Sequence, residues 1–333
     1  MEPKQRYIEL CKIEPSIPLF SRPWWLDVTC GENCWDVTLV EKNNEIVAAM
    51  PYYITRRLGG TVICMPMLTH TMGVWMKYPD KQKYTTMLSF EMEVMDELID
   101  KLPTFSYFYQ HFDHTITNWL PFYWRGFEQT TRYTYICENI KNPGLLWDEL
   151  KSKVRTEIKK AEKSGLTVSE ESNIDVLWQL VFKTFERQGV KPKFTREYLK
   201  GIYESSRANN AGKILVAYDG NRTPYVGLFY VWDEHTAYFI ISGADPELRN
   251  TGATTLLYWQ GMLDAAKTTE RVNFCGSMMK SIELLLRGLG TKQTPYFAIT
   301  SDRRNSLFRE AINIWHLLEL VLRPKKQIRP SRD

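Results

Sequence analysis

The pattern of hydrophobic and polar positions in the second half of the chain predicts an α/β unit. Apolar runs of strand length are joined by short polar turns and predict three consecutive strands. A helical pattern follows, and then come a strand, a helix and a strand. The segments of this β-β-β-α-β-α-β series are residues 213–220, 225–232, 236–243, 252–269, 271–277, 279–290 and 294–300.

The first half of the chain repeats this order of elements, although the two copies do not match in sequence. Its first two strands form a hairpin over residues 34–55 that turns at Asn43-Asn44. The segments that complete the series are residues 60–68, 80–102, 104–112, 118–124 and 129–137. We therefore predict a mixed α/β (α+β) architecture of two similar domains, 1–142 and 143–333, which are joined near residues 141–146.

Helical periodicity predicts further helices between and after the two copies. Val154, Ile158 and Ala161 share one face of the helix that we expect at the start of the second half. A short strand is expected over 166–172. The additional helices are expected over residues 146–165, 174–189, 195–208 and 302–324, the last followed by a basic tail.

Composition narrows the class of protein without identifying it. The chain has 333 residues, of which 44% are hydrophobic, and a net charge of +4, so it permits large cores and only mild attraction to anions. Six scattered cysteines and five histidines show no disulfide framework and no spacing typical of a metal site. The N-terminal residues and the apolar runs predict neither a signal peptide nor a membrane span. We therefore expect a cytoplasmic protein without a metal.

One loop has the character of a phosphate site. The segment Ser242–Gly261 leads from a strand through a polar loop into a helix, which we expect to begin near Thr251 or Gly252. The first N–H groups of a helix have no partner within the helix, and its dipole adds positive charge there, so an anion binds well. The residues that we expect to hold phosphate are Arg249, Asn250, Thr251, Gly252, Ala253 and Thr254.

This loop follows a three-stranded meander and precedes a strand–helix–strand unit, and in that context the second half resembles the GNAT N-acyltransferases. In that family the loop binds the pyrophosphate of acyl-CoA, and two neighbouring parallel strands separate to admit the thioester arm. The family pattern R-x-x-G-x-G/A is incomplete here, because Thr254 occupies the position of its last small residue.

The resemblance extends to the tandem-GNAT group that is related to the Fem peptidoglycan-bridge aminoacyltransferases. The motifs that carry it are FSRPWWLD, AAMPYY, NWLPFYWRGFEQTTRYTY, KVRTEIKKAEKSG, GSM, LLRGLG and PYF, in this order along nearly the whole chain. Fem proteins have two GNAT-like domains and transfer amino acids from aminoacyl-tRNA to an amine of a cell-wall precursor. Other members of the group are assumed to use acyl-CoA.

The strand before the GSM motif departs from related sequences. Two acidic positions in those sequences are Asn273 and Cys275 here, so we expect a site that works without a carboxylate at either position. Alignment and a backbone N–H that stabilises the oxyanion supply much of the acceleration in aminolysis. Ser277 or Tyr258 then protonates the leaving group; the alternatives are a helix N-cap for Ser277 and core packing for Tyr258.

Two further groups of residues have both a functional and a structural interpretation. An aromatic segment forms either a wall of a substrate channel between the halves or part of a core, and two residues of the shared motifs are also assigned to substrate. These substrate residues are Phe122, Tyr123, Trp124, Arg125, Arg287 and Tyr296. A basic helix either meets the phosphates of tRNA or of a nucleotide diphosphate, or is a solvated face. Its residues are Lys151, Arg155, Lys159 and Lys163.

The leading hypothesis is a GNAT-type N-acyltransferase that moves an acyl group from acyl-CoA to an amine. Acyl-CoA is preferred as donor because the net basicity is modest and no segment for a Fem-type helical arm is visible. The first alternative is transfer from aminoacyl-tRNA to the amine of a peptidoglycan precursor. The second is a non-catalytic relative that binds a ligand. Proton transfer is expected to involve water, Ser277 or a group from the other domain.

Overall fold

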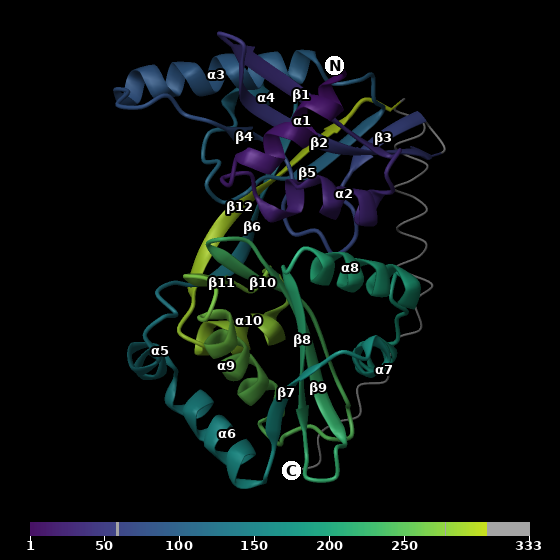
Figure 1. The fold of residues 1–333 in the computed structure, drawn as a ribbon, viewed down its shortest axis with the longest axis vertical. Helices are drawn as coiled ribbons and strands as arrows, with labels where there is room; N and C mark the ends of the chain where they lie inside the picture. Colours follow the sequence, from purple (N-terminus) through teal and green to yellow (C-terminus); the bar gives the residue numbers. More distant parts are fainter. Residues whose placement is uncertain (58–59, 277, 305–333) are drawn as a thin grey trace.

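The computed structural model describes residues 1–57, 60–276 and 278–304. Within them the strands form one continuous twelve-stranded sheet, in the order β1-β2-β3-β5-β12-β6-β11-β10-β9-β8-β7, with β4 paired to β2. The molecule is elongated, with the first half of the chain at one end and most of the second half at the other (Figure 1). The helix expected over 302–324 and the basic tail lie outside the described residues apart from 302–304.

The strands are β1 Trp35–Lys42, β2 Glu45–Arg57, β3 Gly60–Cys64, β4 Trp75–Met76, β5 Tyr107–His111, β6 Glu128–Cys137, β7 Thr167–Glu171, β8 Gly212–Tyr218, β9 Pro224–Trp232, β10 Thr236–Ala244, β11 Arg271–Asn273 and β12 Lys292–Asp302. The helices are α1 Pro3–Ile13, η1 Leu19–Ser21, α2 Pro23–Cys30, α3 Tyr84–Asp100, α4 Leu120–Trp124, α5 Pro143–Glu149, α6 Ser152–Lys163, α7 Ile174–Arg187, α8 Arg196–Ala208, α9 Ala253–Ala265 and α10 Lys280–Gly288.

The repeated order of elements that the sequence predicts is present in both halves. The first half runs β1-β2-β3-α3-β5-α4-β6, with the short β4 added, and the second runs β8-β9-β10-α9-β11-α10-β12. The hairpin turns at Asn43 and Asn44, whose φ angles of 54° and 65° give the left-handed twist of a tight two-residue turn. The mixed α/β class is therefore confirmed.

The single helix expected over residues 146–165 is wrong, because two helices, α5 and α6, occupy this segment. Leu150 and Lys151 between them are extended, with ψ angles of 138° and 145°. The break lets the Leu150 side chain enter the core, where it is 2% exposed. It also lets the Lys151 N–H donate to the carbonyl of Gly288, at the end of α10.

The two halves exchange their last strands. Strand β12, from the end of the second half, lies between β5 and β6 and pairs antiparallel with both. Strand β6, from the first half, lies between β12 and β11. These two long strands run from one end of the molecule to the other (Figure 1), so each half obtains one strand of its sheet from the other.

Hydrophobic cores cover both faces of the sheet in the second half. Helices α5, α6, α9 and α10 pack on one face, and α7 and α8 pack on the opposite face. On the α8 side, η1 and α2 of the first half join the same core through Phe20 and Trp25. The hydroxyl of Tyr198 in α8 donates to the carbonyls of Thr29 and Met67, so the halves are in direct contact.

Candidate functional site

Strands β10 and β11 are parallel and separate shortly after they begin to pair. Their register joins Thr236–Tyr238 to Arg271–Asn273, and β11 ends there while β10 continues to Ala244. Pairing of β10 with β9 is irregular between Phe239 and Ile241, where the strand bulges. Beyond Tyr238 the edge of β10 that faces β11 therefore has no partner strand among the described residues. Backbone N–H groups at such an edge are suited to bind a carbonyl oxygen that gains negative charge.

A pocket of about 810 Å³ lies beside this separation. Its wall includes all six residues that were predicted to hold phosphate, together with Tyr258 of α9 and Ser242 of β10. Four cationic side chains also line it: Lys153, Lys160, Arg187 and Arg249. The pocket thus joins a helix N-terminus and basic side chains at one place, which is the chemistry that binds phosphate.

The loop before α9 is held by contacts from two helices. The carboxylate of Asp245 accepts from Lys183 of α7 at 2.5 Å, and the carbonyl of Asn250 accepts from Lys160 of α6 at 2.6 Å. Gly252 precedes the helix with φ of 79°. A Cβ atom on Gly252 would lie 2.2 Å from the carbonyl oxygen of Glu157 in α6. The glycine therefore allows the close approach of α6, which is a different role from the close approach of an anion expected from the sequence.

Tyr258 lies at the inner end of the pocket and points to β10. Its hydroxyl is 2.7 Å from the hydroxyl of Ser242. Burial raises the pKa of Tyr258 above its ordinary value, and the hydrogen bond with Ser242 opposes this only in part. The phenol therefore keeps its proton near neutral pH, as a group that protonates a leaving thiolate must.

The strand that lost its acidic residues is closed by hydrogen bonds. The side-chain oxygen of Asn273 accepts from Thr134 of β6 at 2.5 Å and from the backbone N–H of Cys275 at 2.9 Å. Asn273 is 2% exposed, so it holds β11 and β6 together. Burial raises the pKa of the Cys275 thiol, which stays protonated and is a poor base. Ser277, the other predicted proton donor, lies outside the described residues.

The predicted substrate residues do not gather in this pocket. Phe122 is buried in the core of the first half, while Tyr123 and Trp124 are exposed beside it. Arg125 pairs with the carboxylates of Asp96 and Asp100 in α3 at 3.0 and 2.7 Å. Their assignment to a substrate channel stays a prediction.

Arg287 and Tyr296 are also apart from each other. Arg287 pairs with Glu283 one turn earlier in α10 at 3.1 Å. Tyr296 of β12 is 5% exposed, and its hydroxyl accepts from Arg132 of β6 at 3.2 Å. Their roles in substrate binding stay predictions.

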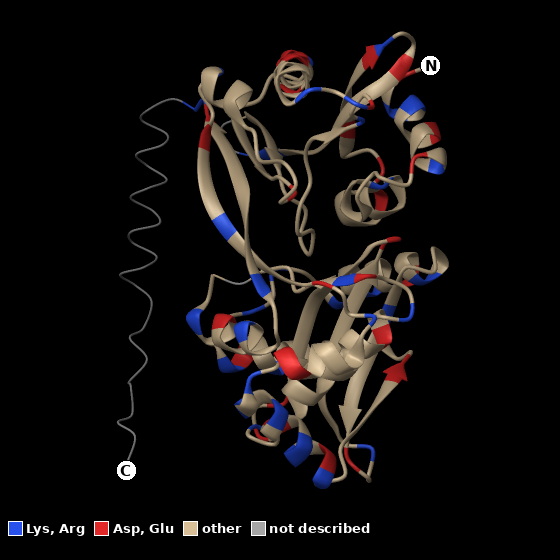
Figure 2. Ribbon diagram, turned by 90° about the vertical axis from the view of Figure 1, so that its left-hand side faces the viewer, with Lys and Arg blue, Asp and Glu red and all other residues tan. Residues whose placement is uncertain are grey.

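The basic helix α6 divides its cations between two uses. Figure 2 shows Lys and Arg residues along it. Arg155 donates to the carbonyls of Trp147, Asp148 and Leu150 at 2.8 to 3.2 Å, and so caps the end of α5. The Lys159 ammonium lies 5.9 Å from the centre of a Trp147 ring. Lys151 and Lys163 are exposed. The two α6 cations that line the pocket, Lys153 and Lys160, were not singled out from the sequence, although their exposed helical positions match those of the others.

A polar cluster where the halves meet was also missed. His111 Nδ1 lies 3.1 Å from the carbonyl oxygen of His70, and its Nε2 lies 2.5 Å from the Tyr109 hydroxyl. A carbonyl only accepts, so Nδ1 carries the proton and Nε2 accepts from Tyr109. The Tyr296 ring stacks edge-on at 4.9 Å from His70 and 5.5 Å from His111. Burial lowers the pKa of His70 to about 3 and that of His111 to about 4, so both are neutral at pH 7.

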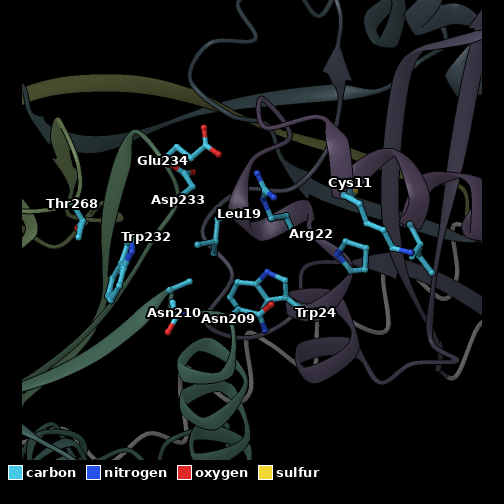
Figure 3. A pocket seen from close by; sticks show the side chains of 14 residues that line it. Cys11, Leu19, Arg22, Trp24, Asn209, Asn210, Trp232, Asp233, Glu234 and Thr268 are labelled. Carbon is cyan, nitrogen blue, oxygen red and sulfur yellow. The ribbon is translucent and has the colours of Figure 1, made fainter.

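A second pocket, of about 740 Å³, also lies between the halves. Arg22, Trp24 and Leu19 line it from the first half, and Trp232 and Glu234 line it from the second (Figure 3). No local pattern in the sequence indicates this pocket, because residues about 200 positions apart form it.

Among the described residues, no helix is long and apolar enough to cross a membrane. Nor do their His, Cys, Asp and Glu side chains form a group of three or more that could hold a metal ion.

Residues 149–277 match the family model of an acetyltransferase (GNAT) domain. The second half contains a GNAT domain. The match begins at the end of α5 and ends just after β11. It therefore includes the pocket loop and the separation of β10 from β11, so in this GNAT domain the pocket lies where the family resemblance places the acyl-CoA pyrophosphate.

Solved structures extend the fold to both halves. FemX is 13% identical, with 96% of this chain and 99% of that chain covered and a TM-score of 0.64. A tandem GNAT protein from the clavulanic acid biosynthesis pathway is 10% identical over 91% and 96% of the two chains, with a TM-score of 0.51. The C-terminal domain of a putative lysylphosphatidylglycerol synthetase from Agrobacterium fabrum is 12% identical over 88% and 91%, with a TM-score of 0.52.

These likenesses concern the fold, which is a Fem-like tandem GNAT fold and that of an acyltransferase. No curated relative matches the sequence. The predicted fold class and the predicted family resemblance are confirmed, whereas the division at residue 142 and the roles of single residues stay predictions.

Proposed function

We propose that the protein is an N-acyltransferase that moves an acyl group from acyl-CoA to an amine. The observation that carries this proposal is the position of the 810 Å³ pocket. The pocket joins the N-terminus of α9, four cationic side chains and the free edge of β10 within the GNAT domain. The phosphates would lie at Arg249–Thr254, and the thioester arm would run between β10 and β11.

The reaction needs few groups beyond this arrangement. The amine nitrogen bonds to the thioester carbon, and the oxygen of the resulting tetrahedral species receives hydrogen bonds from the N–H groups of β10 near its bulge. The C–S bond then breaks. Tyr258 donates its proton to the leaving sulfur and recovers one from solvent, because its pKa is high enough to hold that proton until the thiolate forms.

A second candidate is transfer from aminoacyl-tRNA, with the amine of a peptidoglycan precursor as acceptor. The likeness to FemX over nearly the whole chain and the exposed cations of α6 favour it. Two α6 cations are already occupied, because Arg155 caps α5 and Lys159 lies over Trp147. Lys151 and Lys163 remain as candidate contacts to RNA. A ligand-binding relative without activity is the third reading.

Titration calorimetry with CoA, acetyl-CoA and charged tRNA separates these candidates. Acyl-CoA transfer requires CoA binding that weakens about ten- to a hundredfold in Arg249→Ala, since one charge-assisted phosphate contact is lost. Arg56→Ala, an exposed arginine of β2 in the first half, is the matched control and should bind like wild type. Binding of charged tRNA but not of CoA would favour the Fem-type reaction. CoA binding without transfer to any amine would favour the inactive relative.

A further inference from the structure

The inference concerns the group that takes the proton of the acceptor amine, and it rests on the proposed acyltransferase function. An amine is mostly protonated near pH 7 and must lose a proton before it attacks. Asn273 cannot act as a base, and the buried Cys275 thiol stays protonated. Tyr258 holds its own proton. The described part of the second half therefore offers no base beside the separated strands, and the first half has to supply it.

The loop after β5 brings a carboxylate and an imidazole together at the junction of the halves. His114 Nδ1 lies 3.2 Å from Asp113 Oδ1, and their side chains are 22% and 17% exposed. The same carboxylate oxygen accepts from the backbone N–H of Thr115 at 3.0 Å and from its hydroxyl at 2.8 Å. Burial alone would raise the pKa of Asp113, but these hydrogen bonds outweigh it and lower that pKa to about 2.

A permanent carboxylate defines which nitrogen of His114 can work as a base. Asp113 only accepts, so His114 Nδ1 carries the proton and donates it, and Nε2 presents its lone pair. This is the arrangement in which a carboxylate orients a histidine and stabilises the imidazolium that forms when Nε2 takes a proton. The partial exposure of His114 leaves room for a substrate to approach.

Position in the fold brings this pair near the free edge of β10. Phe112, just before the pair, donates its N–H to Phe297 of β12, next to Tyr296. The charges of Asp113 and Cys275 both act on Tyr238, the last residue of β10 that pairs with β11. Asp113 therefore lies close to the point where the two strands part. The titratable and charged groups that surround the pair are His70, Tyr109, His111, Arg132, Asp233, Tyr238, Cys275 and Tyr296.

The other histidines of the junction are less suitable. Both ring nitrogens of His111 are engaged, one by the carbonyl of His70 and one by Tyr109. The His70 ring is packed between Phe20 and Tyr296. His114 is the histidine of this cluster that combines a carboxylate partner with partial exposure.

We propose that His114 is the general base for the acceptor and that Asp113 is its positioning residue. The acceptor ammonium gives one proton to His114 Nε2, and the neutral nitrogen forms the bond to the thioester carbon. As the C–S bond breaks, the nitrogen loses its second proton to solvent and the sulfur leaves as the thiol, protonated by Tyr258. The products are the amide, free CoA thiol and an imidazolium that returns its proton to water.

The test compares His114→Gln and His114→Ala with the control His235→Gln, an exposed histidine in the turn before β10. We expect kcat/KM to fall about 10²- to 10⁴-fold in both His114 variants, as when a general base is lost. CoA affinity and the unfolding temperature should stay near the wild-type values. The acid limb of the kcat/KM profile should disappear, and imidazole should restore part of the activity of His114→Ala. The His235 control should keep the wild-type rate.

Asp113→Asn tests the positioning role separately. Because the imidazolium loses its neighbouring carboxylate, the acid limb of the profile should move to lower pH while CoA still binds. The proposal is overturned if folded His114→Gln and His114→Ala both keep activity within about threefold and the acid limb of wild type. Wild-type protein that neither binds CoA nor transfers from it would overturn the proposed function instead, and this role with it.

Discussion

At the scale of single residues, the site combines positions whose type is required by packing with positions that act on substrate. Gly252 is the clearest example of the first kind, since its missing side chain is the space that the carbonyl of Glu157 approaches. The sequence pattern of a phosphate loop draws attention to the same glycine. A substitution there therefore reports on the contact between α6 and α9 before it reports on any ligand.

Gly252→Ala should lower the free energy of unfolding by about 2–4 kcal/mol, of which roughly 1 kcal/mol comes from the left-handed backbone and the rest from overpacking. Gly165→Ala is the matched control, because its φ is also 79° but no atom lies within 4 Å of its Cβ position. That control should lose only about 1 kcal/mol. Urea unfolding measures both. Equal losses in the two variants would show that α6 does not approach Gly252 as closely as described.

Cys275 represents a different prediction, in which a residue beside the reaction centre takes no part in the chemistry. Since burial raises the pKa of its thiol, Cys275→Ala removes a neutral group. Steady-state kinetics with the accepted donor should show kcat/KM within about threefold of wild type. A loss of about a thousandfold, the size expected when a general acid or base is removed, would make the thiol a catalytic group.

At the scale of elements, the break between α5 and α6 shapes the basic face of the site. Leu150 enters the core at the break, and Arg155 then returns its guanidinium to three carbonyls at the end of α5. The remaining pocket-lining cations of α6, Lys153 and Lys160, point to the loop before α9. One helix therefore has a structural arginine and a ligand-facing pair of lysines.

Arg155→Met should lower the free energy of unfolding by about 1–2 kcal/mol, because the last carbonyls of α5 lose a charged donor. Lys163→Met, on the exposed end of the same helix, should change it by less than about 0.5 kcal/mol. Chemical denaturation gives both values. If Arg155→Met were as stable as Lys163→Met but lost affinity for tRNA, the arginine would belong to a nucleic-acid surface rather than to α5.

At the scale of the whole molecule, the exchange of β6 and β12 makes the two halves dependent on each other. Each half has the order of elements of a complete unit, yet each sheet contains a strand from the other. The junction that results contains the histidine cluster, the Asp113–His114 pair and the second pocket. The cleft between the halves is thus built by the same pairing that holds the molecule together.

Separately produced fragments 1–142 and 143–333 should not fold on their own, because β6 would lose both neighbours and β12 would lose its partners β5 and β6. Co-expression should give a complex of the two fragments with the circular dichroism spectrum of the intact chain. A cooperative thermal transition in fragment 1–142 alone would contradict this expectation. It would instead support the division at residue 142 as a boundary between independent domains.

The order of helices and strands was predictable from the sequence alone, because periodicity and turn residues such as Asn43 and Asn44 act over a few positions. The phosphate loop was predictable for the same reason, together with its family resemblance. The partners of β6 and β12 were decided only by the tertiary structure, since a strand shows the same pattern whichever strand it joins. The same holds for the approach of Glu157 to Gly252 and for the position of His114 near Tyr238. These contacts join residues about 95 to 125 positions apart, and no local pattern along the chain contains them.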